Sequence, residues 1–201
     1  MTTSKIHLPN VTLIAMTQIG YKNDDHKKAF DKSCQGIEFG ACKLIQLGEI
    51  HDVNSWNRAI VYELHKYVET SHCMLIHADG YVIHPELWEQ KWLEYDYIGA
   101  PWPLPSDDYS YRDELGNIIR VGNSVSLRSK KILELPTRLG LEWRPFYGNT
   151  HEDGFISCHH RKTLEAHGCK FAPFEEALKF SKEAPLPENE GKDTFAFHAY
   201  Q

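Results

Sequence analysis

The sequence has no apolar run long enough to span a membrane and no excess of basic residues. Its first residues, Met1–Lys5, also lack the apolar core of a secretory signal. With a formal net charge of -6, the chain does not carry the basic balance that is typical of nucleic-acid-binding proteins. We therefore expect a cytoplasmic protein without a transmembrane segment and without a nucleic-acid partner.

Cysteine is scarce, and the spacing of the cysteines does not indicate a disulfide framework. The 5 cysteines are odd in number and scattered, which favours reduced thiols over a disulfide framework. Cys158, His159 and His160, followed by His167 and Cys169, suggest zinc, but their spacing does not match that of zinc fingers. We interpret this segment as a helix with Cys158 facing inward and the imidazoles exposed.

No internal repeat divides the chain, and its 201 residues suit one globular domain. In the first half, short apolar runs alternate with amphipathic segments. The runs at 11–16, 42–47 and 73–76 predict strands, and the segments after Asn23 and at 56–68 predict helices. This alternation predicts an α/β fold with a mostly parallel central sheet and helices on both faces.

The alternation weakens in the second half. We expect a helix from Pro85 through Leu93, strands at 97–99 and 121–127, and a helix from Glu152 to Gly168. Residues 103–120 are rich in Pro, Asp, Tyr and Gly and predict a long loop. Such loops are uncommon in compact domains and are often functional lids.

The apolar run that begins at Cys73 stops abruptly at His77, Ala78, Asp79 and Gly80. On a strand, His77 and Asp79 would point the same way, and an imidazole beside a carboxylate can hold a divalent cation. Ligands also bind at the strand ends of open α/β sheets. The alternative is an ordinary turn in which Asp79 accepts bonds from the following backbone amides.

Glu152 and Asp153 stand at a predicted helix start, where they could cap the helix or act in catalysis. The residues before them, Trp143 and 146–151, are aromatic and polar, as in a carbohydrate site, but the rings could equally belong to the core. His198 lies in an aromatic tail, where an extended backbone would separate it from Phe195 and Phe197.

A tight turn at Gly122, Asn123 and Ser124 could bring the backbone close to a sugar, or be an ordinary turn. Together these groups fit a nucleotide-sugar transferase. Such a reaction needs a cation to neutralise the leaving diphosphate and a carboxylate to deprotonate the acceptor hydroxyl.

Several short sequence motifs point to a particular family. In order they are YDYIGAPW at 95–102, GNSVSLRS at 122–129, HED at 151–153, KFSKE at 179–183 and FAFH at 195–198. They resemble a family of uncharacterised glycosyltransferases with the GT-A fold. The resemblance implies a single GT-A-like domain over residues 1–201, with a Rossmann-like nucleotide-sugar-binding half at about 1–102 and an acceptor and catalytic half at about 103–201.

The resemblance also implies roles. His77-Ala78-Asp79 stands where the family has Asp-x-Asp, so the first carboxylate of that motif is absent. Ser124 and Val125 replace the family's usual second and third glycines. The expected catalytic residues are Asp153 as base and Glu152 as a contact for acceptor hydroxyls. The expected metal ligands for Mn²⁺ or Mg²⁺ are Asp79, His198 and His77, and the expected substrate-binding residues are Ala15, Met16, Thr17, Trp102, Gly122, Asn123 and Ser124.

The leading hypothesis is therefore a metal-assisted, inverting transferase that uses a nucleoside-diphosphate sugar and a glycan or other hydroxyl acceptor. Two alternatives stay open at this stage. One is a metal-dependent phosphoester hydrolase, since His, Asp and a metal also serve hydrolysis. The other is a non-catalytic nucleotide-sugar or carbohydrate-binding module, which the Ser124 and Val125 departures favour.

Overall fold

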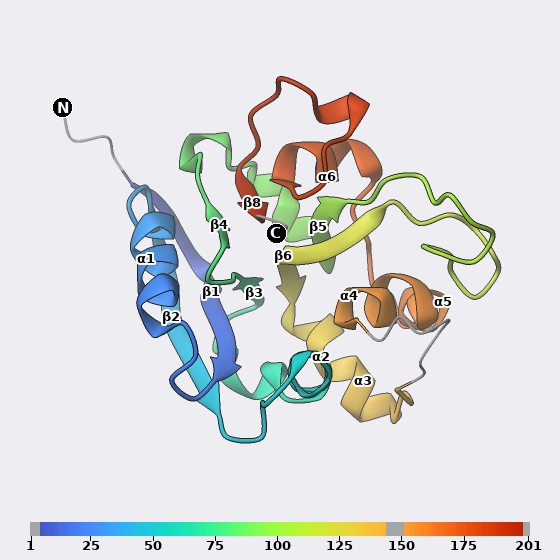
Figure 1. Ribbon diagram of the computed structural model, residues 1–201, viewed down its shortest axis with the longest axis horizontal. Helices are drawn as coiled ribbons and strands as arrows, with labels where there is room; N and C mark the ends of the chain where they lie inside the picture. Colours follow the sequence, from blue (N-terminus) through green and yellow to red (C-terminus); the bar gives the residue numbers. More distant parts are fainter. Residues whose placement is uncertain (1–4, 144–150, 199–201) are drawn as a thin grey trace.

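The computed structural model describes residues 5–143 and 151–198, apart from the side chains at positions 123 and 124. Its centre is a five-stranded sheet in the order β2-β1-β3-β6-β5 (Figure 1). β1 pairs in parallel with β2 and β3, whereas β6 runs antiparallel to β3 and β5. The strands are β1 (Ile6–Gln18), β2 (Ile37–Leu47), β3 (His72–Leu75), β5 (Tyr97–Pro101) and β6 (Val121–Ser129).

The predicted α/β class is confirmed, but the prediction of a mostly parallel sheet is wrong. The sheet is mixed, with two parallel and two antiparallel pairs of neighbours. Helical crossovers keep the first three strands parallel, whereas β6 follows a long loop and inserts between β3 and β5. Val125 and Leu127 of β6 are fully buried, but their local sequence does not indicate in which direction the strand runs relative to its neighbours.

Alternate residues of β1 face two different hydrophobic clusters. Leu13 and Ala15 pack in one cluster, and Ile14 and Met16 pack in the other. β3 alternates in the same way, with Met74 in the first cluster and Leu75 in the second. The central strands are therefore buried on both faces, which explains their continuous apolar runs.

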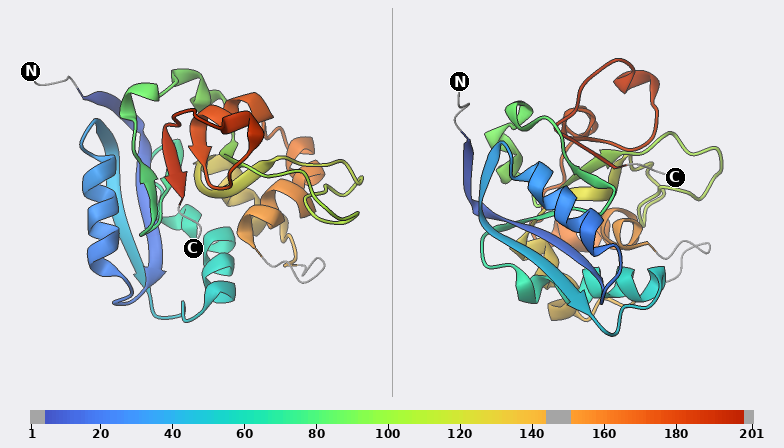
Figure 2. Two further views of the ribbon diagram at one scale, coloured as in Figure 1. Left: turned by 45° about the horizontal axis from the view of Figure 1, so that its top comes forward. Right: turned by 60° about the vertical axis from the view of Figure 1, so that its left-hand side comes forward.

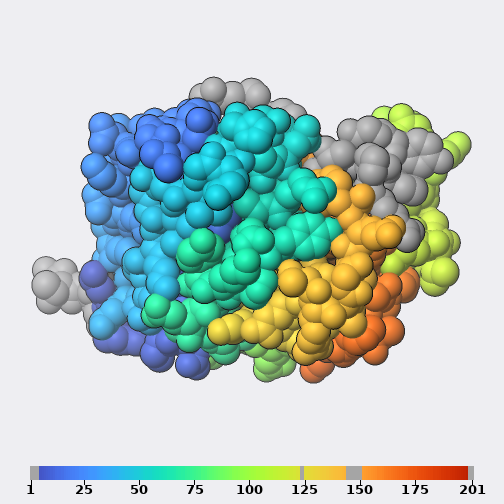
Figure 3. Space-filling model, turned by 90° about the horizontal axis from the view of Figure 1, so that it is seen from below, coloured from blue at the N-terminus to red at the C-terminus, as the bar shows by residue number. Residues whose placement is uncertain are grey.

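Helices cover both faces, as the sequence predicts. α1 (Asn23–Ser33) and α6 (Phe174–Phe180) contribute to the cluster that contains Leu13. α2 (Val53–Tyr62) and α3 (Lys130–Leu139) contribute to the other cluster. Seen from below, Figure 3 shows α2, the short helix η1 (Leu64–Tyr67) and α3 packed side by side.

A second, three-stranded sheet brings the end of the described chain to the centre of the molecule (Figure 2). Its order is β4-β8-β7, formed by β4 (Gly80–Val82), β7 (Ser181–Lys182) and β8 (Ala196–His198). β8 pairs antiparallel with β4, so that His198 stands opposite Gly80. Phe195, just before β8, is fully buried. The segment up to His198 is therefore an integral part of the fold.

Three predicted helices are interrupted. The segment expected to be helical at 56–68 belongs to α2 only up to Tyr62 and continues as the 3₁₀ helix η1. The segment expected to be helical from Pro85 forms two short 3₁₀ helices, η2 (Pro85–Leu87) and η3 (Gln90–Glu94). The expected helix from Glu152 to Gly168 consists of α4 (Glu152–Gly154), the π-helix η4 (Phe155–His159) and α5 (Arg161–Ala166). At the break, the ring of His160 packs on Phe155 and contacts the carbonyl of Glu142. The expected ends of the helix are therefore close to the observed ones, but the His160 imidazole, expected to be exposed, is buried.

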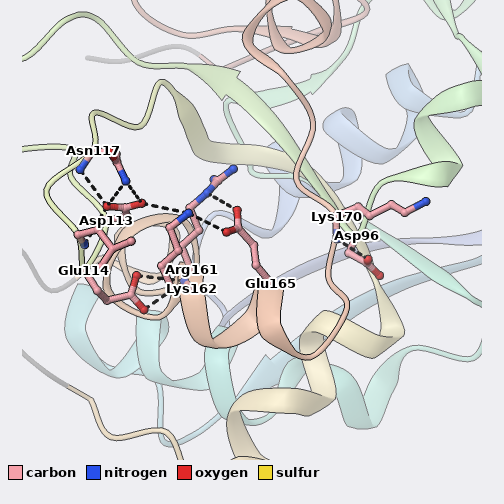
Figure 4. A network of polar contacts seen from close by, with 9 residues as sticks. Asp96, Asp113, Glu114, Asn117, Arg161, Lys162, Glu165 and Lys170 are labelled. Atoms are coloured by element: carbon pink, nitrogen blue, oxygen red, sulfur yellow. Dashed lines mark hydrogen bonds and ion pairs between the residues drawn. The ribbon is translucent and has the colours of Figure 1, made fainter.

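The loop at 103–120 has the irregular backbone that its composition predicts, and α5 anchors it (Figure 4). Asp113 accepts hydrogen bonds from the side chain of Asn117 and is ion-paired with Lys162 at 3.4 Å. Glu114 accepts from the backbone N–H of Lys162 at 3.1 Å. The loop is therefore held against the helix that follows the Glu152-Asp153 pair.

Another short 3₁₀ helix, η5 (Pro187–Asn189), lies in the segment before β8. Over the described ranges, no helix combines the length and the apolarity needed to cross a membrane.

Candidate functional site

A pocket of about 1040 Å³ lies where β1, the turn after β3, α2, α4 and β8 come together. Many of the residues singled out from the sequence line it, although they come from distant parts of the chain. These residues are Met16, Thr17, His77, Asp79, Trp102, Glu152, Asp153 and His198. The fold thus brings the expected metal-binding, catalytic and nucleoside-side residues to a single pocket.

Two of the expected substrate-binding residues, Ala15 and Gly122, do not line the pocket. Ala15 is fully buried and points into the core cluster beside Leu13, away from the pocket. The expected turn at Gly122 is wrong, because Gly122 lies within β6. A Cβ atom at Gly122 would meet the indole of Trp102 at 2.3 Å, so this glycine makes room for the Trp102 ring. The side chains of Asn123 and Ser124 lie outside the described residues.

The aromatic segment before Glu152 is only partly described. Residues 146–150 lie outside the described ranges, but Trp143 and His151 lie inside them. The Trp143 ring stacks on Phe155 with centroids 5.4 Å apart and belongs to the core cluster of α2 and α3. His151 lines the pocket. For Trp143, the core interpretation is therefore confirmed.

The turn after β3 places His77 and Asp79 at the pocket. The backbone N–H of His77 donates to the carbonyl of Gly80 at 2.8 Å, which makes residues 77–80 a tight turn into β4. A Cβ atom at Gly80 would lie 2.7 Å from the His198 ring, so glycine permits the close approach of β8. The predicted turn is confirmed, but the bond that closes it joins the backbone of His77 and Gly80 and not the Asp79 side chain, which lines the pocket.

His198 connects two carboxylates from different parts of the chain. Its Nε2 lies 3.4 Å from Asp79 Oδ1, and its Nδ1 lies 3.1 Å from Glu183 Oε1. Burial lowers the pKa of His198, but the hydrogen bond to Glu183 and the charges of Glu183 and Asp79 outweigh it and leave the pKa above its usual value. The His77 ring lies 5.0 Å away, centroid to centroid.

Glu183 is a site residue that sequence reasoning did not assign. It lines the pocket, and its side chain is only 8% exposed. The phrase KFSKE at 179–183 marked its segment, but only the pairing of β7 with β8 brings Glu183 beside His198. Across the described residues, the structure forms no ready-made cluster of three or more His, Cys, Asp or Glu side chains arranged for a metal ion.

Glu152 is held by an ion pair in the interior. Arg128 Nη1 lies 2.7 Å from Glu152 Oε2, and the two side chains are 0% and 3% exposed. The backbone N–H of Glu152 donates to Asn57 Oδ1 at 2.8 Å. A buried ion pair whose partners lie on β6 and α4 is costly to break, so it fixes the start of α4 relative to the sheet.

Asp153, the next residue, retains some exposed surface and lines the pocket. Its Oδ1 accepts a hydrogen bond from the backbone N–H of Gly154 at 2.7 Å. Removal from water and then the negative charge of Glu152 raise the pKa of Asp153 from the usual 3.8 to about 7. A carboxyl group with a pKa near the working pH is suited to general base catalysis.

Trp56, the first residue of the segment predicted to be helical at 56–68, also lines the pocket. Its Nε1–H donates to the carbonyl of Met16 at 2.6 Å, and its ring lies 5.4 Å from that of His77. Lys22 and His26, at the start of α1, also line the pocket. No charge pattern in the sequence distinguished Lys22 from the surface lysines of α1.

Comparison with known proteins supports a glycosyltransferase-like fold. A crystal structure of a glycosyltransferase involved in the glycosylation of the major capsid of PBCV-1 is similar to this chain, with a TM-score of 0.58 and 11% sequence identity. The match covers 94% of this chain and 91% of that chain. At the level of sequence, the chain belongs to the family described as "Protein of unknown function (DUF5672)", whose model matches residues 46–198. No curated protein sequence matches it.

Proposed function

We propose that this protein is a glycosyltransferase that moves a sugar from a nucleoside-diphosphate donor to an acceptor hydroxyl, with inversion and with help from a divalent cation. One observation carries the proposal: Asp153, with a pKa of about 7, lines the same pocket as Asp79 and His198. The glycosyltransferase-like fold supports it.

Asp79 and His198 are the side chains that would hold Mn²⁺ or Mg²⁺. Their facing atoms, 3.4 Å apart, provide one carboxylate oxygen and one imidazole nitrogen, both of which suit Mn²⁺. Such cations commonly complete their coordination with substrate phosphates and water, so a preformed cluster of three side chains is not required. The cation would neutralise the charge that develops on the leaving diphosphate.

Asp153 is the proposed base. In its ionised form it accepts the proton of the acceptor hydroxyl as that oxygen attacks the anomeric carbon and the bond to the diphosphate breaks. Glu183 interacts with both the proposed cation site and the proposed base, because it is hydrogen-bonded to His198 and its charge also raises the pKa of Asp153. A contact between Glu152 and an acceptor hydroxyl stays a prediction.

Met16 and Thr17, at the end of β1, are the proposed contacts for the nucleoside. Both line the pocket, and the bond from Trp56 to the Met16 carbonyl fixes this end of the strand. The wall formed by Trp102 and Tyr111, whose rings stack 4.8 Å apart, is the proposed acceptor side.

A titration series tests the proposal. Thermal melting is followed with a panel of nucleoside diphosphates and nucleotide sugars, each with and without Mn²⁺, and a stabilising donor is then tested for consumption. The expected result is Mn²⁺-dependent stabilisation by one donor class and transfer to a hydroxyl. Binding without turnover would favour a binding module, and release of phosphate from simple phosphoesters would favour a hydrolase.

A further inference from the structure

Two of the five cysteines lie next to each other at the edge of the five-stranded sheet, where the end of α1 meets β2. Cys34 is the residue that ends α1, and Cys42 lies on the edge strand β2. Their sulfur atoms are 3.7 Å apart, although the residues are separated by eight positions in sequence. Cys42 is exposed and Cys34 is partly exposed, so small reagents can reach the pair.

The other three cysteines provide an internal contrast. Cys73, Cys158 and Cys169 are 0%, 3% and 5% exposed and pack in hydrophobic clusters. Burial raises the pKa of Cys73 to about 12 and that of Cys169 to about 11. Thiols of this kind are inert, because the thiolate is the reactive form.

We propose that Cys34 and Cys42 are a thiol pair that closes to a reversible disulfide when the protein meets a small disulfide oxidant. The geometry carries this assignment. A disulfide requires the two sulfur atoms to approach to about 2.05 Å, which asks for a movement of less than about 2 Å in exposed side chains.

The electrostatics of the pair favour Cys34 as the attacking group. The hydrogen bond from Cys42 lowers the pKa of the Cys34 thiol to about 7, and the positive charge of Lys5 acts in the same direction. The Lys5 ammonium donates to the Cys34 carbonyl at 2.9 Å. These effects favour the thiolate form of Cys34, whereas the same hydrogen bond raises the pKa of Cys42.

The chemistry balances with oxidised glutathione as the oxidant. The Cys34 thiolate attacks one sulfur of glutathione disulfide, and one glutathione leaves as its thiolate. Cys42 then loses its proton and attacks the Cys34 sulfur of the mixed disulfide, which expels the second glutathione. Two electrons pass from the protein to the oxidant, and one intramolecular S–S bond results.

The bond would tie the C-terminal end of α1 to the edge strand. The other end of α1 carries Lys22 and His26 at the pocket wall, so oxidation restrains an element that borders the candidate site. Because the cross-link closes a short loop in the unfolded chain, we expect it to raise the melting temperature by roughly 5 °C.

Peptide mapping of the full-length protein tests the proposal directly. Cys34 and Cys42 share one tryptic peptide, residues 33–43, whereas Cys169 lies alone in residues 163–170. After treatment with oxidised glutathione, the protein is unfolded in denaturant and its free thiols are blocked. Peptide 33–43 should then take up no blocking groups and be lighter than its reduced form by about two hydrogens, about 2 Da. Peptide 163–170 should take up its blocking group whether or not the protein has met oxidised glutathione. Dithiothreitol should restore the free thiols of Cys34 and Cys42.

Two variants separate closure from simple thiol reactivity. Cys42→Ser should stop at the mixed disulfide of Cys34 with glutathione, and Cys34→Ser should give no internal bond. The Cys169→Ser control should oxidise like the wild type. Persistent blocking of both cysteines in the wild-type peptide, or a stable glutathione adduct in place of the internal bond, would overturn the proposal.

Discussion

Replacing Asp153 with asparagine should stabilise the protein at neutral and alkaline pH but have little stabilising effect in acid. In the folded protein, removal from water and the charge of Glu152 raise the pKa of Asp153 to about 7. In the unfolded chain, the carboxyl group ionises at its usual pKa. Between these two values only the folded state holds the proton, so stability falls as pH rises and the loss is complete above about pH 7.

The magnitude follows from the difference between the two pKa values. The rise from 3.8 to about 7 is about three pKa units. At about 1.4 kcal/mol per unit, the ionised form costs the folded state up to about 4 kcal/mol. Between about pH 4.5 and about pH 8, the stability of the wild type relative to Asp153→Asn should therefore fall by about 3 kcal/mol.

Urea denaturation followed by tryptophan fluorescence measures this quantity. The free energy of unfolding of both proteins is measured at the two pH values. The difference between wild type and variant at one pH is then compared with that at the other, so that the contributions of other titrating groups largely cancel. Asp31→Asn, a change at an exposed carboxylate on α1, is the matched control. A difference between wild type and Asp153→Asn that is the same at both pH values would refute the raised pKa and with it the argument for Asp153 as base.

Three further changes test other parts of the site. Arg128→Met should destabilise the fold by about 3 to 5 kcal/mol because it leaves the buried Glu152 carboxylate unpaired, and adding Glu152→Gln should recover part of the loss in urea denaturation. Gly122→Ala should lower the free energy of unfolding by about 1 to 3 kcal/mol, and with it the melting temperature, because the new Cβ meets the Trp102 ring. An unchanged melting temperature would contradict this contact. Asp79→Asn should weaken Mn²⁺-dependent donor binding by at least about tenfold in calorimetry without changing the melting temperature, and unaltered affinity would remove Asp79 from the proposed cation site.

Elements with a strong local signal were predictable from the sequence. The apolar core of β1 and the long loop at 103–120 are where the patterns indicated. The apolar face predicted at 56–68 packs in the core, although the segment is divided between α2 and η1. Local patterns indicate which apolar residues are buried, but strand direction depends on partners that lie far away in sequence. This is why the position of β6 between β3 and β5, and the mixed sheet that results, could not be read from its residues.

The candidate site was predictable in its residue types and less so in its geometry. Asp79, Asp153 and His198 do come to one pocket. Arg128 could not be recognised as the partner of Glu152, because a basic residue in a strand is usually at the surface, and here it is 0% exposed. Glu183 acquires its place only through the β7–β8 pairing. In both cases the information lies in long-range contacts.

The central claim, that this pocket transfers a sugar with Asp153 as base, is tested most directly by one assay. Wild type and Asp153→Asn are incubated with the stabilising nucleotide sugar, Mn²⁺ and a panel of hydroxyl acceptors, and release of the nucleoside diphosphate is measured together with the anomeric configuration of the product. The account predicts release by the wild type with inversion at the anomeric carbon. In Asp153→Asn it predicts release slower by about a hundredfold or more, with donor affinity retained. Transfer with retention of configuration, or equal rates in the two proteins, would contradict it.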